Sequence, residues 1–193
     1  MKILFHACCG VCSLYPIKVM QEEGIDFALY YANPNIHPYK EWKERKKTFV
    51  AVAEMYHVRH YIEKEYPLED FLRTQLTYAN RCEYCYRSRL ELTAKKALEE
   101  GYDTISTTLF ISPYQNRELI IKVGTEIAAA HGLDFYSRDF REGFPYAQEL
   151  AVEKELYRQK YCGCIFSERD RYMKRKKKKN AASETALESK ETL

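Results

Sequence analysis

Seven cysteines are the residues with the clearest capacity for chemistry in this sequence, and they fall into three groups with none outside them. The groups lie in "HACCGVCS", in "RCEYCYRSRL" and in "YCGCIFSERD", and their members are Cys8, Cys9 and Cys12, then Cys82 and Cys85, then Cys162 and Cys164. Thiolates act as nucleophiles, redox couples and metal ligands. Such clustering in a chain of 193 residues favours shared metal centres over buried structural thiols.

The number of thiols separates the possible metal centres. Structural zinc closes with four ligands, and the three groups offer more than one zinc takes. A [4Fe–4S] cluster takes four thiolates, and the three that remain can hold a second metal with one open position, as a catalytic ion requires. Cys8 and Cys9 could then serve two centres, because neighbouring side chains of an extended segment point apart. A redox pair at Cys9 and Cys12 is the alternative, and it leaves the other cysteines without a role.

The elements that must position these groups alternate between strand and helix. Short apolar or aromatic runs predict strands, and longer amphipathic runs predict helices. The predicted strands cover 2–7, 25–34, 58–66, 102–112 and 133–139, and the predicted helices cover 13–24, 39–57, 68–76, 82–101, 115–132 and 147–161. This order predicts a single α/β domain with a Rossmann-like, mostly parallel sheet flanked by helices.

In an open parallel sheet, ligands bind at the carboxyl ends of the strands, against helix N-termini. The first cysteine group occupies the turn after the first strand, where the positive end of a helix stabilises a thiolate. The second group shares one face at the start of a helix, and Gly163 lets the loop of the third group bend around a ligand. We therefore expect a cysteine-rich metal site at this edge of the sheet.

Composition indicates the class of protein and its environment. Hydrophobic residues make up 46% of the chain and the net charge is +3, which fits a globular protein. No apolar run reaches the ~18–20 residues of a membrane span, and the opening residues do not resemble a signal peptide. We expect a cytoplasmic protein without membrane contact, whose thiols stay reduced. We assign 1–179 to a metal-binding catalytic domain and 180–193 to a disordered polar tail.

Six phrases in order resemble the family of cobalamin-independent epoxyqueuosine reductases, QueH, over nearly the whole chain to about Tyr172: "HACCGVCS", "YYANPNIHPYKEW", "RCEYCYRSRL", "TTLFISPYQN", "RDFREGF" and "YRQKYCGCIFSERDR". The resemblance implies an oxidoreductase that removes the epoxide oxygen from epoxyqueuosine at the wobble position of tRNA. The substrates implied are tRNAs with GUN anticodons, those for aspartate, asparagine, histidine and tyrosine, and an external donor supplies electrons.

The resemblance also implies two cofactors, a [4Fe–4S] cluster and an adjacent mononuclear iron. By motif match, all seven cysteines fall on metal-site positions, without a division between cluster and iron. The cofactor-binding set is Cys8, Cys9, Cys82, Cys85, Cys162 and Cys164, with Cys12 added for the metal site. The cluster would supply electrons, and the iron would act as a Lewis acid on the epoxide oxygen.

Polar residues after the second predicted strand are the candidates for substrate contact or proton supply: Asn33, Asn35 and His37. Proteins bind anticodon loops by stacking extruded bases on aromatic side chains and by binding phosphates through basic ones. The candidates for stacking are Tyr30, Tyr31, Tyr84, Tyr86 and Tyr114. The candidates for phosphates are Arg81, Arg87, Arg89, Arg117 and the lysine run 174–179. His6 is either a core histidine or a hydrogen-bond partner of a thiolate.

Two other classes of protein stay open on the residues alone. A PP-loop-type tRNA-modifying enzyme places a Gly-rich Ser motif for pyrophosphate after its first strand, where this sequence has cysteines and one glycine. A zinc-stapled RNA-binding module would use the cysteines without catalysis. Iron and sulfide in anaerobically purified protein would exclude that module.

Overall fold

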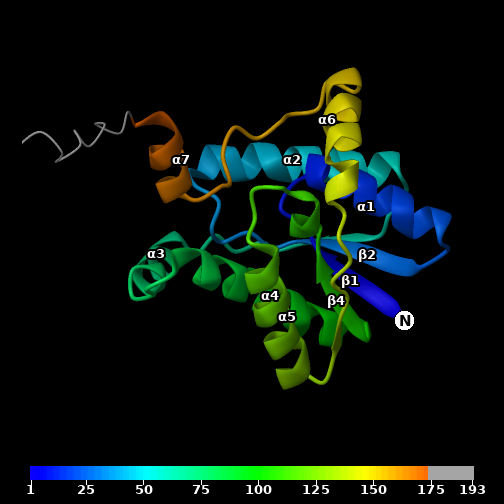
Figure 1. Ribbon diagram of the computed structural model, residues 1–193, viewed down its shortest axis with the longest axis horizontal. Coiled ribbons are helices and arrows are strands. Elements are labelled where there is room, and N and C mark those ends of the chain that lie inside the picture. Colours follow the sequence, from blue (N-terminus) through cyan, green and yellow to red (C-terminus); the bar gives the residue numbers. More distant parts are fainter. Residues whose placement is uncertain (174–193) are drawn as a thin grey trace, which may run out of the picture.

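A five-stranded sheet forms the centre of the protein (Figure 1), in a computed structural model that describes residues 1–173. The strands are β1 (Lys2–His6), β2 (Asp26–Tyr31), β3 (His60–Ile62), β4 (Thr104–Thr107) and β5 (Asp134–Phe135). Their order is β3-β2-β1-β4-β5, and every neighbouring pair is parallel. The predicted α/β fold with a parallel sheet is therefore confirmed. Because β1 is central, the turn that follows it opens at the middle of the carboxyl edge.

Helices cover both faces of this sheet. On one face, α1 (Gly10–Glu22) packs against α2 (Tyr39–Met55) and α6 (Phe144–Glu153), and on the other α4 (Arg81–Glu100) packs against α5 (Arg117–Ala130) (Figure 1). Two short helices complete the set: α3 (Leu68–Gln75), which packs on α4, and α7 (Ile165–Tyr172). None of the helices in residues 1–173 combines the length and the apolarity that crossing a membrane requires.

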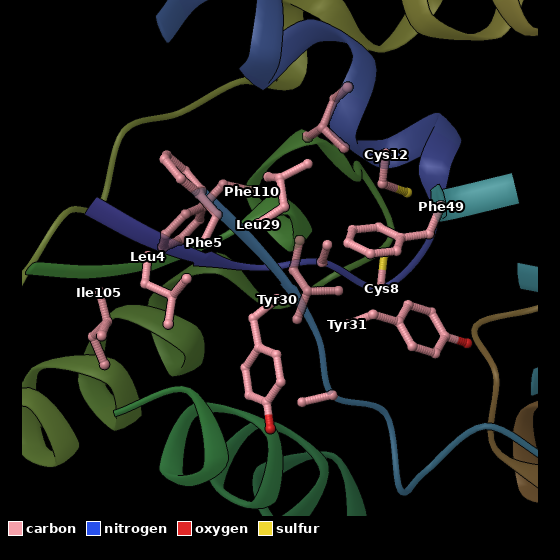
Figure 2. Packing of buried hydrophobic residues seen from close by; sticks show 14 of the residues in the cluster. Leu4, Phe5, Cys8, Cys12, Leu29, Tyr30, Tyr31, Phe49, Ile105 and Phe110 are labelled. Atoms are coloured by element: carbon pink, nitrogen blue, oxygen red, sulfur yellow. The ribbon is translucent and has the colours of Figure 1, made fainter. Parts of the chain in front are cut away.

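The core lies around β1, whose side chains are buried on both faces. Ile3, Leu4 and Phe5 have no exposed surface, as expected of a central parallel strand under helices on both sides. Figure 2 shows Leu4 and Phe5 within this core, together with Cys8 from the turn after β1 and Cys12 from the first turn of α1. Each large apolar side chain buried here stabilises the fold by about 1.5–3 kcal/mol. The first cysteine group is thus attached to the most firmly packed strand.

The predicted strands 58–66 and 133–139 are shorter in the structure, as β3 and β5, and two other predicted elements differ more. The predicted strand 102–112 ends at Thr107, because the Thr107 hydroxyl accepts a hydrogen bond from the Leu109 N–H at 3.1 Å and the chain turns into a 3-10 helix, Thr108–Ile111. The predicted helix 147–161 is α6, which begins earlier at Phe144 and ends at Glu153. Glu155 has a φ of 52°, a left-handed conformation that terminates a helix. Residues 154–164 form an irregular loop, called here the cysteine loop.

The start of α1 approaches α2 closely. Gly10 has no side chain, and a Cβ atom at this position would lie 2.5 Å from the Thr48 carbonyl oxygen of α2. The two helices can meet here only because residue 10 is glycine. This contact fixes the turn that carries Cys8 and Cys9 against α2.

We expect the substitution Gly10→Ala to lower the free energy of unfolding by about 1–3 kcal/mol, because the added methyl group must push the two helices apart. Urea denaturation of the wild type and the variant measures this difference. In an uncrowded helix the same change would stabilise the protein by about 1 kcal/mol, so a stabilised variant would contradict the close approach.

Candidate metal centre

The three-cysteine group, Cys8, Cys9 and Cys12, occupies the turn after β1 and the first turn of α1. Its sulfur atoms all lie within 4.8 Å of one another, and all three residues are buried. The Cys9 sulfur caps α1 by accepting a hydrogen bond from the Cys12 N–H at 3.4 Å, and it lies 4.0 Å from the Cys8 sulfur. The neighbouring sulfurs therefore converge instead of pointing apart, because the chain folds back into a helix at Gly10.

One thiol of this group is favoured as a thiolate. Hydrogen bonds from Cys12 and then Cys9 lower the pKa of Cys8, whereas burial raises the pKa of Cys9 and the hydrogen bond to Cys8 raises the pKa of Cys12. Burying more than one thiolate without a counter-charge is costly. A bound cation removes this cost and lets the remaining thiols ionise. The three-cysteine group could therefore bind a metal.

The four-cysteine group, Cys82, Cys85, Cys162 and Cys164, joins the start of α4 to the end of the cysteine loop. The hydrogen bond between Cys85 and Cys164 raises the pKa of Cys85 and lowers the pKa of Cys164 to about 5. Burial, followed by the charges of Cys162 and Cys164, raises the pKa of Cys82. The Gln75 amide donates a hydrogen bond to the Cys85 sulfur at 2.9 Å. Segments about eighty residues apart in sequence thus bring their thiols together.

Both groups open into one cavity of about 490 Å³, called here the thiol cavity, which Cys8, Cys12 and Cys162 line. All seven cysteines are free thiols, as the sequence predicts. Four thiolates are the donor set of a [4Fe–4S] cluster, and three are the donor set of an ion with one open position. The three-cysteine group therefore fits a metal ion by its geometry, and the four-cysteine group supplies the number of thiols that a cluster takes.

Arg45 of α2 holds the cysteine loop in place. Its side chain has no exposed surface, and it donates hydrogen bonds to the carbonyls of Cys162 at 2.9 Å and Tyr161 at 2.8 Å. Its Nε donates to Glu41 at 2.7 Å, and Glu41 accepts a further hydrogen bond from Tyr157. These contacts fix the end of the cysteine loop against α2.

Two of the polar residues after β2 lie against the cysteine loop with buried atoms that lack partners. Within residues 1–173, neither polar atom of the Asn35 side chain has a hydrogen-bond partner, and neither has Nε2 of His37. The His37 N–H donates to the Gly163 carbonyl at 2.8 Å, and His37 Nδ1 accepts from the Ile165 N–H at 3.4 Å. Buried donors are rarely left unsatisfied. Their position beside Cys164 fits a bound group with acceptor atoms, such as the sulfides of a cluster.

Asn33 and His6 have a different role, since they tie the ends of the strands together. The Asn33 amide donates to the Ala7 carbonyl at 2.8 Å, and Asn33 Oδ1 lies 3.2 Å from His6 Nε2. His6 Nδ1 lies 2.9 Å from the Thr107 hydroxyl of β4. Burial lowers the pKa of His6 to about 3, so it is neutral. Both side chains therefore support the turn that carries Cys8.

The rim of the thiol cavity carries aromatic, basic and amide side chains. Tyr114 is 83% exposed and packs edge-on against Phe144. The Gln115 amide donates to the Cys162 sulfur at 3.4 Å, and the Gln159 amide donates to the Cys12 sulfur at 3.7 Å. Three basic residues line the same cavity: Arg158, Lys160 and Arg171. None of the three basic residues was among the predicted phosphate contacts. The segment "YRQK" directly before the third cysteine group contains two of them, Arg158 and Lys160, and could have indicated their place at the site.

The other candidates for RNA contact are mostly engaged within the fold. Tyr30, Tyr31 and Tyr86 are buried, and Tyr84 packs against Phe71 and Tyr78. Ion pairs join Arg81 to Asp170, Arg87 to Glu83 and Glu126, and Arg117 to Asp139. Arg89 is buried, and the lysine run 174–179 lies outside the described residues. Of the predicted stacking residues, Tyr114 is the one that lines the thiol cavity.

Comparison with known proteins gives the family. The family model described as "Epoxyqueuosine reductase QueH" matches residues 3–170. The chain belongs to this family. An epoxyqueuosine reductase QueH of Dehalococcoides mccartyi is 32% identical over 174 residues, which cover 90% of this chain and 96% of the relative. A QueH of Staphylococcus epidermidis is 34% identical over 181 residues, 86% of this chain and 76% of the relative. The family predicted from the cysteine phrases is therefore confirmed, and with it the class of oxidoreductase.

We expect Arg45→Met to lower the free energy of unfolding by about 3–5 kcal/mol, because it leaves the Glu41 carboxylate buried without its cation. Chemical denaturation measures the loss, and limited proteolysis of residues 154–164 reports release of the cysteine loop. The double variant Arg45→Met, Glu41→Gln should lose less than the single one. Arg73→Met is the matched control, since Arg73 is exposed in its pair with Asp70. Equal losses of unfolding free energy for Arg45→Met and Arg73→Met would contradict the role of Arg45 in holding the cysteine loop.

Proposed function

We propose that this protein reduces epoxyqueuosine to queuosine at the wobble position of tRNA, using a [4Fe–4S] cluster and a mononuclear iron held by its seven cysteines. The observation that carries the proposal is the buried group of Cys8, Cys9 and Cys12, whose sulfur atoms lie within 4.8 Å of one another at a cavity that Cys162 of the four-cysteine group also lines. This grouping supports a cluster on the four-cysteine group and an iron on the three-cysteine group. Membership of the reductase family supports the reaction, and disfavours the PP-loop enzyme and the zinc-stapled module.

The substrates we propose are the tRNAs with GUN anticodons, modified in the cytoplasm with electrons from an external donor. The thiol cavity offers the contacts that an extruded nucleotide needs. Tyr114 presents an exposed ring for stacking, and Arg158, Lys160 and Arg171 present positive charge for phosphates. Single-stranded RNA is bound by this combination of aromatic stacking and basic residues.

The chain's own residues bind and orient the nucleotide around the reacting epoxide. Val11, Leu109 and Phe144 form the apolar part of the cavity wall, and they exclude water from the nucleotide. Gln159 Oε1 is buried without a partner in the described chain, so it is free to accept a hydrogen bond from a hydroxyl group of the substrate. When bound, the two metal groups supply electrons and a Lewis acid for opening the epoxide.

The candidate residues Asn33, Asn35 and His37 have two different roles in the proposed function. We assign Asn35 and His37 to the group held by the cysteines, since their unpartnered atoms lie beside the cysteine loop and not on the cavity wall. Asn33 positions the three-cysteine group through Ala7. None of the three is required to touch the tRNA.

We expect the anaerobically reconstituted protein to contain sulfide, together with iron in excess of that sulfide, and to convert epoxyqueuosine-containing tRNA. Cys12→Ser should lose the excess iron and keep the sulfide, whereas Cys85→Ser should lose the sulfide. Metal and sulfide analysis beside nucleoside analysis of the tRNA measures both outcomes. Selective chelation of the single iron should abolish turnover while the cluster remains. Full activity with the cluster alone, or a colourless protein with stoichiometric zinc, would refute the proposal.

We expect Tyr114→Ala to weaken tRNA binding by about 1–3 kcal/mol, roughly 5- to 150-fold in Kd, through the loss of one stacked base. Tyr114→Phe should bind like the wild type, because the ring is retained. Equilibrium binding at one fixed salt concentration measures both. Tyr39→Ala is the control, since Tyr39 is 53% exposed and lies outside the cavity lining. An equal loss in the control would contradict stacking at Tyr114.

A further inference from the structure

Arg89 is a buried cation without an acidic partner. It lies on α4, one turn after Cys85, and its side chain is 1% exposed. Its Nε donates to the Cys85 carbonyl at 2.8 Å, and its guanidinium lies 5.7 Å from the centre of the Tyr86 ring. Among residues 1–173, no carboxylate oxygen is found within 4.0 Å of its nitrogen atoms. Neither the carbonyl nor the ring supplies a full negative charge.

The other fully buried arginine of residues 1–173, Arg45, has the acidic partner that Arg89 lacks. Arg45 also has no exposed surface, but Glu41 lies 2.7 Å away and neutralises it. A guanidinium stays charged in proteins, and a buried charge is costly unless it is paired. Arg89 therefore requires an anion that the acidic residues of the described chain do not provide.

The cysteine that Arg89 contacts is Cys85, one turn earlier on α4, whose carbonyl oxygen accepts its hydrogen bond and whose side chain is buried. A cluster bound by four thiolates carries net negative charge. The group that the four-cysteine group holds is therefore the anion that the position of Arg89 favours.

We propose that Arg89 is the fixed counter-charge of the metal centre, placed beside Cys85 of the four-cysteine group. Its charge stabilises the more negative, reduced form of the cluster that the four-cysteine group holds. This raises the reduction potential of the cluster. The inference rests on the proposed function, because it concerns the same cysteines. Arg89 is a positioning charge and does not line the thiol cavity.

Two substitutions at this residue separate its charge from its hydrogen bond. Arg89→Lys keeps the charge, and Arg89→Gln keeps a donor for the Cys85 carbonyl but removes the charge. Arg87→Gln is the matched control, since it removes the same charge two residues away on the same helix, where Arg87 is 33% exposed and paired with Glu126. Iron and sulfide content and the midpoint potential of the cluster, followed by electron paramagnetic resonance during a redox titration, are the readouts.

We expect Arg89→Gln to disfavour reduction of the cluster by about tenfold in the one-electron equilibrium, a shift of about 59 mV to lower potential. Arg89→Lys and Arg87→Gln should stay close to the wild type. The shift should persist at high salt, because a buried charge is screened little. Loss of the cluster in Arg89→Gln but not in Arg89→Lys supports the same role.

An unchanged potential in Arg89→Gln would overturn the inference, and so would loss of the cluster in both Arg89 variants, which would indicate a packing role. These outcomes differ from a failure of the proposed function. In that case the wild-type protein itself would lack iron and sulfide, or would hold them and leave epoxyqueuosine-containing tRNA unchanged.

Discussion

Thiols that ionise repel one another, yet this fold holds three of them within 4.8 Å of one another. The repulsion must be overcome by parts of the structure that do not depend on the thiols. The three-cysteine group is attached to β1, whose residues 3–6 are fully buried between two layers of helices. Close packing of α1 on α2 at Gly10 fixes the same turn from the other side. The site therefore draws its geometry from the hydrophobic core, which forms whether or not the thiols are charged.

Charge balance is the second requirement of such a site, and the two buried arginines meet it in different ways. Arg45 is neutralised by Glu41 and uses its remaining donors to fix the carbonyls of the cysteine loop. Its contribution is therefore positional. Arg89 has no carboxylate partner in residues 1–173 and remains a net positive charge beside the Cys85 backbone. The start of α1 adds the positive end of a helix dipole at the three-cysteine group.

The cysteine loop carries thiols of the four-cysteine group and basic residues of the cavity rim. Its end carries Cys162 and Cys164, while Arg158 and Lys160 within it line the thiol cavity. A helix over these residues would turn successive side chains to different faces. The irregular backbone presents basic side chains and thiols to the same cavity. In the proposed function, substrate binding and cofactor binding thus depend on one segment, which the Arg45 guanidinium holds.

The sequence by itself determined the alternation of strands and helices, the parallel sheet and the family. These depend on local periodicity and on the spacing of cysteines, which are properties of short segments. The boundaries of β1, α2 and α4 could be predicted closely for this reason, and the placement of the cysteine groups at strand and helix ends followed from them.

Only the tertiary structure decided which side chains surround the thiols. The pairing of Cys85 with Cys164 and the hydrogen bonds from Arg45 to the cysteine loop join atoms from distant parts of the chain. The pattern of 147–161 is helical by composition, but the helix ends at Glu153 and the loop that follows is held by Arg45 of α2. Tyr30 and Tyr31 are likewise removed from RNA contact by burial. Local sequence carries no information about such distant partners, since they depend on where the core brings the segments together.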